Sequence, residues 1–207
     1  VTASLPSINF PLGTICNATG SSLTRPTVIK HVIVILFENR DAGAVVGNVA
    51  APYFNSIRAQ CGSSTQFLDN AFSTDLVSLP HYLALTSGSN CNTGIGTSGS
   101  GCITNDSSPS SKRLTTRSVF NQVISWKAYQ EDMPRACDWG NPASGTKYWV
   151  KHNPPPYFTQ VTDCGINDIG IPRLSCPTSL NGTCGTPQGA FTADLANDTL
   201  PAYSFVT

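Results

Sequence analysis

Two oxygen-bearing side chains follow the most apolar run of the chain, at a place where a metal ion could bind. Residues 32–37 are six apolar residues in succession, and Glu38 and Asn39 come directly after them. A carboxylate and an amide oxygen are hard ligands of the kind that divalent cations prefer. The sequence therefore predicts a divalent metal ion at Glu38 and Asn39. The simpler interpretation is that both residues only end a strand and cap the next segment.

A serine stands where a helix is expected to begin. Ser78 precedes a Leu-Pro pair, and residues 79–86 are expected to form a helix that ends at Gly88. A serine at this place is commonly an N-cap, which is the ordinary interpretation. The same place puts a hydroxyl in the positive potential of a helix N-terminus, which favours an alkoxide and a bound phosphate. With a cation at Glu38 and Asn39 to activate it, Ser78 becomes a candidate nucleophile for phosphoryl transfer.

The elements that would position these side chains alternate between strands and helices. Residues 32–37 are predicted to form a parallel strand buried on both faces, because the run is β-branched and does not alternate. Further strands are expected at residues 66–73, 125–131 and 203–206, further helices at residues 51–60 and 118–124, and a short helical turn at residues 193–195. This order predicts an α/β fold with a mainly parallel sheet flanked by helices. In such sheets, ligands bind beyond the carboxyl ends of the strands.

The 207 residues are expected to form a single α/β domain. Residues 1–29 are rich in Pro, Ser and Thr and predict an extended lead-in. Residues 134–192 are rich in Cys, Pro and Gly, show little periodicity, and predict an irregular insertion held by disulfides.

The cysteines indicate an oxidising compartment. There are eight of them, with no CxxC pair, which favours four disulfides over a zinc or redox motif. We expect short-loop pairs Cys91–Cys102 and Cys176–Cys184, and the further pairs Cys16–Cys61 and Cys137–Cys164. The sequence therefore predicts a secreted protein, extracellular or periplasmic. Asn-x-Ser/Thr sequons, which are compatible with a secreted glycoprotein, occur at Asn17, Asn105, Asn181 and Asn197.

The charge balance limits the classes of partner. Lys and Arg together number 12, as do Asp and Glu, so the formal net charge is zero. A neutral chain is not drawn to nucleic acid or to an anionic membrane surface, so no nucleic-acid partner is expected. No apolar run approaches the roughly 18 residues that a membrane span needs, so no membrane-spanning segment is expected. The oligomeric state is left open.

Five segments resemble a known family of enzymes. Residues 29–40, with Glu-Asn after an apolar strand, and residues 78–88, with Ser78-Leu-Pro-His-Tyr, resemble the opening strand and the nucleophile segment of a phosphoesterase family. This family includes bacterial acid phosphatases and phosphatidylcholine-type phospholipases C, and it is alkaline-phosphatase-like. Residues 125–134, 151–154 and 200–207 are similar to later segments of the family in the same order.

The resemblance implies a fold and a mechanism. It implies an alkaline-phosphatase-like α/β fold, with Glu38 and Asn39 as ligands of a divalent metal ion. Ser78 would form a phosphoserine intermediate on a phosphate-ester substrate, as in an acid phosphatase or a phospholipase C. The family usually continues past a segment like residues 204–207 with further metal ligands, so the chain is expected to be incomplete at its C-terminal end. A fragment of a longer polypeptide and a truncated relative with little activity both fit this pattern.

Three other side chains are candidates for phosphate binding. His81 stands where the family usually has an Asn that donates to phosphate, and a protonated His81 would donate best, which predicts an acidic pH preference. His81 could instead pack on the helix surface. Lys151 and His152 could bind phosphate, although a solvated loop is the plainer interpretation.

Two other functions compete with that of a phosphoesterase. A catalytically incomplete secreted module that binds phosphate or a sugar would keep the fold without the full set of metal ligands. A serine hydrolase acting on acyl esters is disfavoured, because the chain has no Gly-x-Ser-x-Gly segment.

Overall fold

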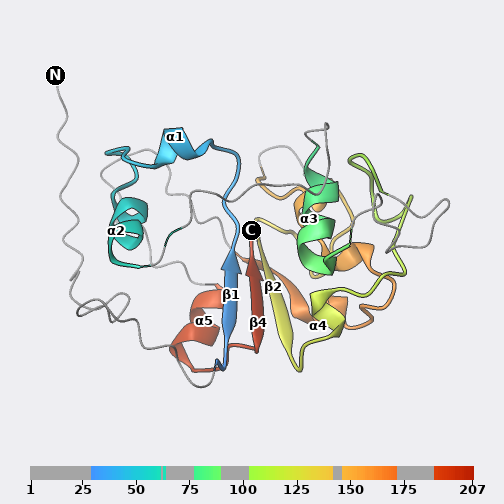
Figure 1. Cartoon of the computed structure of the whole chain (residues 1–207). Helices are drawn as coiled ribbons and strands as arrows, with labels where there is room; N and C mark the ends of the chain where they lie inside the picture. The colour runs from blue at the N-terminus through green and yellow to red at the C-terminus, as the bar shows by residue number, and fades with distance from the viewer. Residues whose placement is uncertain (1–28, 62, 64–76, 90–102, 142–145, 172–188) are drawn as a thin grey trace. The chain divides into compact units, whose positions relative to one another are not determined.

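In the described residues, four short strands form one parallel sheet in the order β1-β4-β2-β3 (Figure 1). They are β1 (Val32–Ile35), β2 (Trp126–Glu131), β3 (Asp168–Ile171) and β4 (Tyr203–Val206). The last strand of the sequence therefore lies between the first two, as crossover connections in a parallel sheet allow. The predicted α/β class with a parallel sheet is confirmed. The alkaline-phosphatase-like superfamily stays a prediction.

The computed structural model describes residues 29–61, 63, 77–89, 103–141, 146–171 and 189–207. The chain divides into two compact units. The larger unit consists of Ile29–Leu36 and Asp69–Thr207, and the smaller one of Val1–Val28 and Phe37–Leu68. The sheet lies in the larger unit, and the single domain expected from the sequence stays a prediction.

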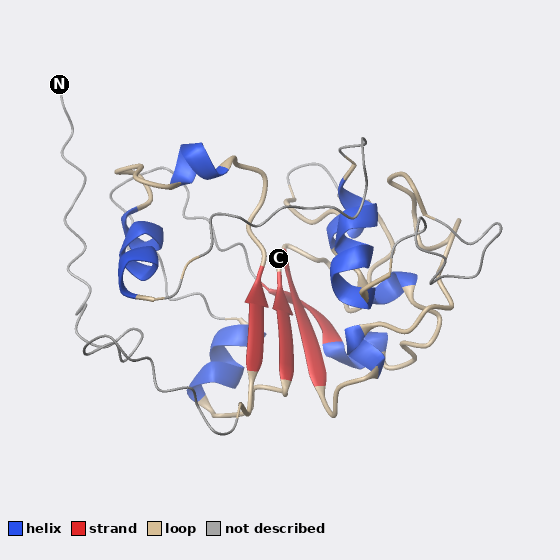
Figure 2. Ribbon diagram, viewed as in Figure 1, coloured by secondary structure: helices blue, strands red, loops and turns tan. Residues whose placement is uncertain are grey.

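Both units contain helices, which Figure 2 draws in blue. The larger unit contains α3 (Ser78–Ser87), α4 (Cys164–Asn167) and α5 (Ala190–Ala196), and the smaller unit contains α1 (Ala42–Val45) and α2 (Pro52–Gln60). Single 3₁₀ turns form at η1 (Val119–Asn121), η2 (Val150–His152) and η3 (Pro155–Tyr157). The helices predicted at residues 51–60 and 79–86 are confirmed by α2 and α3, and the turn predicted at residues 193–195 lies within α5.

The helix predicted at residues 118–124 is wrong in extent, because only the 3₁₀ turn η1 forms there. The Ser118 N–H donates to Asn121 Oδ1 at 2.8 Å, and the Gln122 side chain donates to the Ser118 carbonyl at 3.0 Å. These local bonds compete with a longer helix, and the two valines of the segment favour one only weakly.

The irregular insertion predicted at residues 134–192 is wrong for residues 164–171, which form α4 and β3. Strand β3 pairs in parallel with β2, from Ala128 opposite Asp168 to Glu131 opposite Ile171. Four residues carry too little periodicity to predict a strand, and this one is stabilised by its neighbour in the sheet. The strand predicted at residues 66–73 lies outside the described residues, whereas those at 125–131 and 203–206 are confirmed by β2 and β4.

The burial expected of the first strand is wrong. Strand β1 forms where it was predicted, but it pairs only with β4 in the described sheet and lies at the edge. The side chains of Val32 and Ile35 are close to half exposed. An apolar run without alternation predicts a strand between two layers, but its actual burial depends on the neighbours that pack on it.

Apolar clusters cover both faces of the sheet around β2 and β4. On one face, Phe120 of η1 packs against Trp126 and Phe205, with ring centroids 4.9 and 6.2 Å apart. On the other face, Tyr129 packs against Phe191 of α5 at 5.0 Å. Alternating side chains of β2 thus point to two different layers, as in other α/β proteins.

Asp194 ties α5 to β2 and to the loop after the helix. Its Oδ2 accepts hydrogen bonds from Lys127 Nζ at 2.6 Å and from the Tyr129 hydroxyl at 2.7 Å, and its Oδ1 accepts one from Thr199 at 2.8 Å. Desolvation raises the pKa of Asp194, but the hydrogen bonds from Lys127, Tyr129 and Thr199 outweigh it and hold the pKa below its ordinary value. The charged carboxylate therefore stabilises the folded state.

Replacing Asp194 with asparagine is expected to lower the free energy of unfolding at pH 7 by about 1–2 kcal/mol, because hydrogen bonds to a charged group are lost. A lowered carboxyl pKa stabilises a protein above the unfolded-state pKa of about 3.9 and loses this effect as the pH falls through the folded-state pKa. The difference between the two proteins should therefore shrink in acid. Urea unfolding at pH 7 and at successively lower pH measures it, and a difference that does not change with pH would contradict the charged interaction.

No helix in the described part of the chain is both long enough and apolar enough to cross a bilayer.

Candidate functional site

Ser78 is the first residue of α3, and Val77 occupies the N-cap position in an extended conformation. One N–H group of the first turn is satisfied by a side chain distant in sequence, because Asp106 Oδ1 accepts a hydrogen bond from the Leu79 N–H at 3.0 Å. The interpretation of Ser78 as an ordinary N-cap is therefore wrong. The helix begins at the serine, and a carboxylate from elsewhere in the fold caps it.

Lys151 reaches the same helix end through Asp106. Its Nζ donates to Asp106 Oδ2 at 2.8 Å, and the same Nζ lies 5.3 Å from the centroid of the Trp149 ring. Desolvation raises the pKa of Asp106, but the bonds from Lys151 and from the Leu79 N–H outweigh it and lower the pKa. The solvated-loop interpretation of Lys151 is thus replaced by a defined ion pair beside the start of α3.

His152 lies against the body of the same helix. Its ring stacks on that of Tyr82, with centroids 5.1 Å apart and planes inclined by 26°. The Tyr82 hydroxyl and the Thr207 hydroxyl are 3.5 Å apart, which brings α3 to the residue that follows β4. The helix thus lies at the carboxyl end of the sheet, the edge where α/β proteins bind ligands.

His81 is half-buried on α3, three residues after Ser78. Residues spaced by three or four lie on the same side of a helix, so His81 and Ser78 share a face. The roles of His81, Lys151 and His152 in phosphate binding stay predictions. The structure brings the segment of Lys151 and His152 together with helix α3, which begins at Ser78.

Glu38 and Asn39 belong to the smaller unit, where both side chains are exposed just ahead of α1. Their exposed carboxylate and amide oxygens are a donor set that fits a hard divalent cation. Ser78 belongs to the larger unit. Metal binding by Glu38 and Asn39, and their approach to Ser78, therefore stay predictions.

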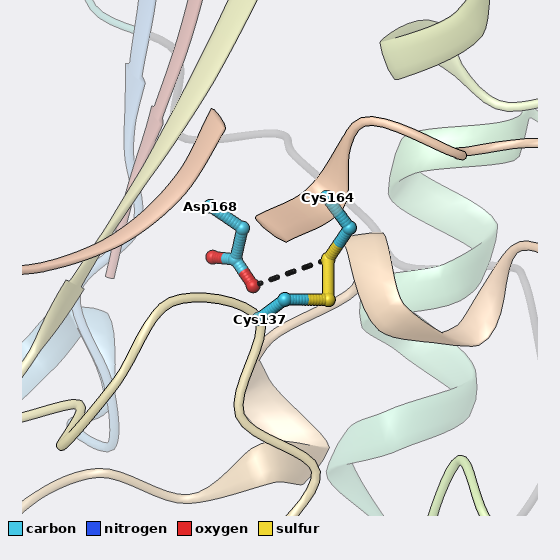
Figure 3. A group of neighbouring side chains, drawn as sticks. All are labelled: Cys137, Cys164 and Asp168. Carbon is cyan, nitrogen blue, oxygen red and sulfur yellow. Dashed lines mark hydrogen bonds between the residues drawn. A yellow bond between two sulfur atoms is a disulfide. The ribbon is translucent and has the colours of Figure 1, made fainter. Parts of the chain in front are cut away.

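One group of side chains has metal-ligand spacing but a different chemistry. Sulfur atoms of Cys137 and Cys164 and a carboxylate oxygen of Asp168 lie within 4.8 Å of one another (Figure 3). The two sulfurs are joined in a disulfide, so neither is a thiolate that could bind a metal ion. The group is therefore a disulfide beside a buried carboxyl.

The disulfide Cys137–Cys164 confirms one predicted pair. Cys61 is also disulfide-bonded, and the described residues do not include its partner. The remaining predicted pairs involve residues outside the described ranges, at Cys16, Cys91, Cys102, Cys176 and Cys184.

Sequence reasoning missed two residues that shape this region. Asp106 lies 27 residues after Leu79, and Asp168 lies 15 residues after its hydrogen-bond partner Asn153. Neither separation matches a helix or strand repeat, so no local pattern marks these aspartates. Only the fold shows that Asp106 caps α3 and that Asp168 bonds the residue that follows Lys151 and His152.

The arrangement at the start of α3 suits an anionic ligand. The helix has ten residues, and its N-terminus carries the partial positive charge of the helix dipole. Lys151 adds an ammonium group, which its ion pair with Asp106 holds in place and partly neutralises. Phosphate binding at this end of the helix stays a prediction.

The chain is distantly similar to two phosphatases. It is 27% identical over 176 residues to a phosphatidylinositol-3-phosphatase of Mycobacterium tuberculosis, across 85% of this chain and 48% of that protein. It is 36% identical over 87 residues to a phosphate-repressible acid phosphatase of Penicillium chrysogenum, across 41% of this chain and 18% of that protein. The matched part thus spans about half the length of the first relative and less of the second. No family model and no solved structure matches the chain.

Proposed function

We propose that the chain bears the nucleophile of a secreted, metal-dependent phosphoesterase that hydrolyses phosphate esters through a phosphoserine at Ser78. The observation that carries the proposal is the start of α3, where Ser78 opens the helix and Asp106 joins the Leu79 N–H to Lys151. The distant similarity to two phosphatases supports the same class of reaction.

The reaction takes place in two displacements at phosphorus. Ser78 Oγ loses its proton to solvent and attacks the phosphate ester, the bond from phosphorus to the ester oxygen breaks, and the leaving oxygen takes a proton from solvent. Water then attacks the phosphoserine and loses a proton to solvent, the bond from phosphorus to Ser78 Oγ breaks, inorganic phosphate leaves, and Ser78 Oγ takes a proton from solvent. The positive N-terminal end of the α3 dipole and the Lys151 ammonium would stabilise the charge on the phosphoryl oxygens.

Glu38 and Asn39 are the proposed ligands of the metal ion. A divalent cation bound there would supply Lewis-acid stabilisation of the phosphoryl group and would activate the hydroxyl nucleophile. Both relatives are named as phosphatases, which favours phosphate monoesters over the diesters that a phospholipase C cleaves. The disulfide Cys137–Cys164 supports an oxidising compartment, extracellular or periplasmic.

Hydrolysis of p-nitrophenyl phosphate by the full chain, with and without a chelator, tests this function. We expect turnover that the chelator abolishes and that an added divalent cation restores, because the metal neutralises charge in the transition state. Activity that the chelator leaves unchanged would contradict the metal. A chain that binds inorganic phosphate without hydrolysing the ester, at every divalent cation supplied, would instead support the phosphate-binding module.

A further inference from the structure

A fully buried carboxyl group, that of Asp168, contacts the segment that carries Lys151 and His152. Asp168, the first residue of β3, is completely buried. Its Oδ2 accepts a hydrogen bond from Asn153 Nδ2 at 2.7 Å, and its Oδ1 has no hydrogen-bond partner among the described residues. Figure 3 shows the carboxyl beside the disulfide Cys137–Cys164, which offers it no positive charge. An ionised carboxylate would be costly in this place.

Asn153 connects Asp168 to the 3₁₀ turn η2. It is fully buried and occupies the C-cap position of η2, directly after His152. Besides its bond to Asp168, Asn153 Nδ2 lies 3.1 Å from the Tyr148 hydroxyl, which donates to the Asp138 carbonyl. The C-terminal end of η2 is therefore fixed by the hydrogen bond from Asn153 to Asp168.

The other contacts of η2 lead directly to the nucleophile helix. Lys151 is hydrogen-bonded to Asp106, which accepts from the Leu79 N–H, and His152 stacks on Tyr82. A shift of η2 would move both side chains relative to the start of α3. Displacements of about 1 Å at such a distance from the chemistry can lower a rate by about 100-fold.

We propose that Asp168 is a positioning residue which, as a neutral acid, holds Asn153 and through it keeps Lys151 and His152 against α3, and that ionisation of this buried carboxyl loosens the hold. The proposal rests on the proposed function for its effect on turnover, but the positioning itself is a property of the fold. The bond from Asn153 by itself favours the ionised form, but the ionised form also places an uncompensated charge in the interior, and hydration of that charge requires the surrounding segment to open.

The surroundings of Asp168 favour the neutral form. Burial is the largest cause that raises its pKa, the charge of Asp138 raises it further, and the hydrogen bond from Asn153 opposes them, so that the pKa lies at about 8. Asp138 is itself paired with Arg135 at 2.7 Å, and the Tyr148 phenol has its own pKa raised, chiefly by burial. On β2 the residue opposite Asp168 is Ala128, and the facing cysteines form a disulfide that does not titrate.

The sign of the effect on stability follows from the raised pKa. The folded protein binds the Asp168 proton more tightly than the unfolded chain, whose aspartates titrate near pH 3.9. Stability from this group is therefore complete in acid, declines as the pH rises from about 4 to about 8, and changes little above that.

The test compares Asp168→Asn, which keeps the shape of the neutral acid, with Asp168→Ala, which removes the contact. In the wild type, we expect inorganic phosphate affinity and ester turnover to fall about 10- to 100-fold in alkali, with a midpoint near the pKa of about 8. The Asp168→Asn protein should keep both values across this range, and the Asp168→Ala protein should show the low values at every pH. The titration of phosphate itself is common to all three proteins.

A second measurement reports positioning without any turnover. The His152 ring protons in the nuclear magnetic resonance spectrum, assigned with a His152→Gln variant, should carry a ring-current shift from Tyr82. That shift should be lost in alkali in the wild type and retained in Asp168→Asn. Identical pH profiles of the wild type and Asp168→Asn would overturn the proposal. Absent turnover with the expected His152 shifts would refute the proposed function and leave the positioning role standing.

Discussion

Replacing Ser78 with alanine is expected to abolish phosphate-ester hydrolysis, with a loss in kcat of about 10⁴-fold or more, the scale seen when a catalytic nucleophile is removed. The reason is that no phosphoserine can form, while the remaining groups can only bind and polarise the ester. The first turn of α3 keeps its cap, because the Leu79 N–H donates to Asp106. The free energy of unfolding should therefore change by less than about 1 kcal/mol.

The matched control is Ser87→Ala, the same substitution at the other end of α3. The Ser87 hydroxyl donates to the Leu83 carbonyl at 2.7 Å, so its loss tests a structural hydroxyl of the same helix. Turnover of p-nitrophenyl phosphate and thermal unfolding compare the three proteins. Acid quenching should trap a phosphoryl group on the Ser78 peptide of the wild type. Substantial turnover in Ser78→Ala would refute the nucleophile.

Replacing Glu38 with glutamine is expected to weaken divalent-cation binding by about 100-fold or more, because outer-shell substitutions alone cost about 10- to 100-fold and this change removes a charged ligand. Turnover at limiting metal should fall in parallel, and an excess of cation should restore part of it. Titration calorimetry with the metal alone measures the affinity independently of any substrate.

Asp198→Asn is the control for the loss of one negative charge. Asp198 is exposed in the loop between α5 and β4, which leads into the amino end of that strand and so lies away from the carboxyl edge of the sheet. Its positive φ of 56° is a conformation that asparagine also tolerates. Metal affinity that is unchanged in Glu38→Gln would remove this residue from the site and would leave the cation to other ligands.

The cap on α3 explains how a serine at a helix start can be left for chemistry. In the usual arrangement, the hydroxyl oxygen of a serine before the first turn accepts a hydrogen bond from a backbone N–H. Here the carboxylate of Asp106 accepts that hydrogen bond, and Lys151 balances the charge of the carboxylate. The oxygen of Ser78 makes no hydrogen bond to another described residue. A helix N-terminus with a distant cap thus combines positive potential with an uncommitted hydroxyl.

Local patterns were enough for much of the secondary structure. The apolar run before Glu38, the spacing after Ser78, and the strand-like residues 203–206 each carry their signal within a few residues, and β1, α3 and β4 form there. The parallel sheet follows from the alternation of such elements. The even cysteine count likewise predicted disulfides, of which Cys137–Cys164 is confirmed.

Tertiary structure alone decided the edge position of β1, the strand β3 and the partners of the site. Each depends on contacts between residues far apart in the chain, such as Leu79 with Asp106 and Asn153 with Asp168. A side chain's periodicity reflects its own segment, whereas its burial, its pKa and its hydrogen-bond partner depend on what the fold places opposite it. For that reason a serine at a helix start was predictable from sequence, and the carboxylate that caps its helix was not.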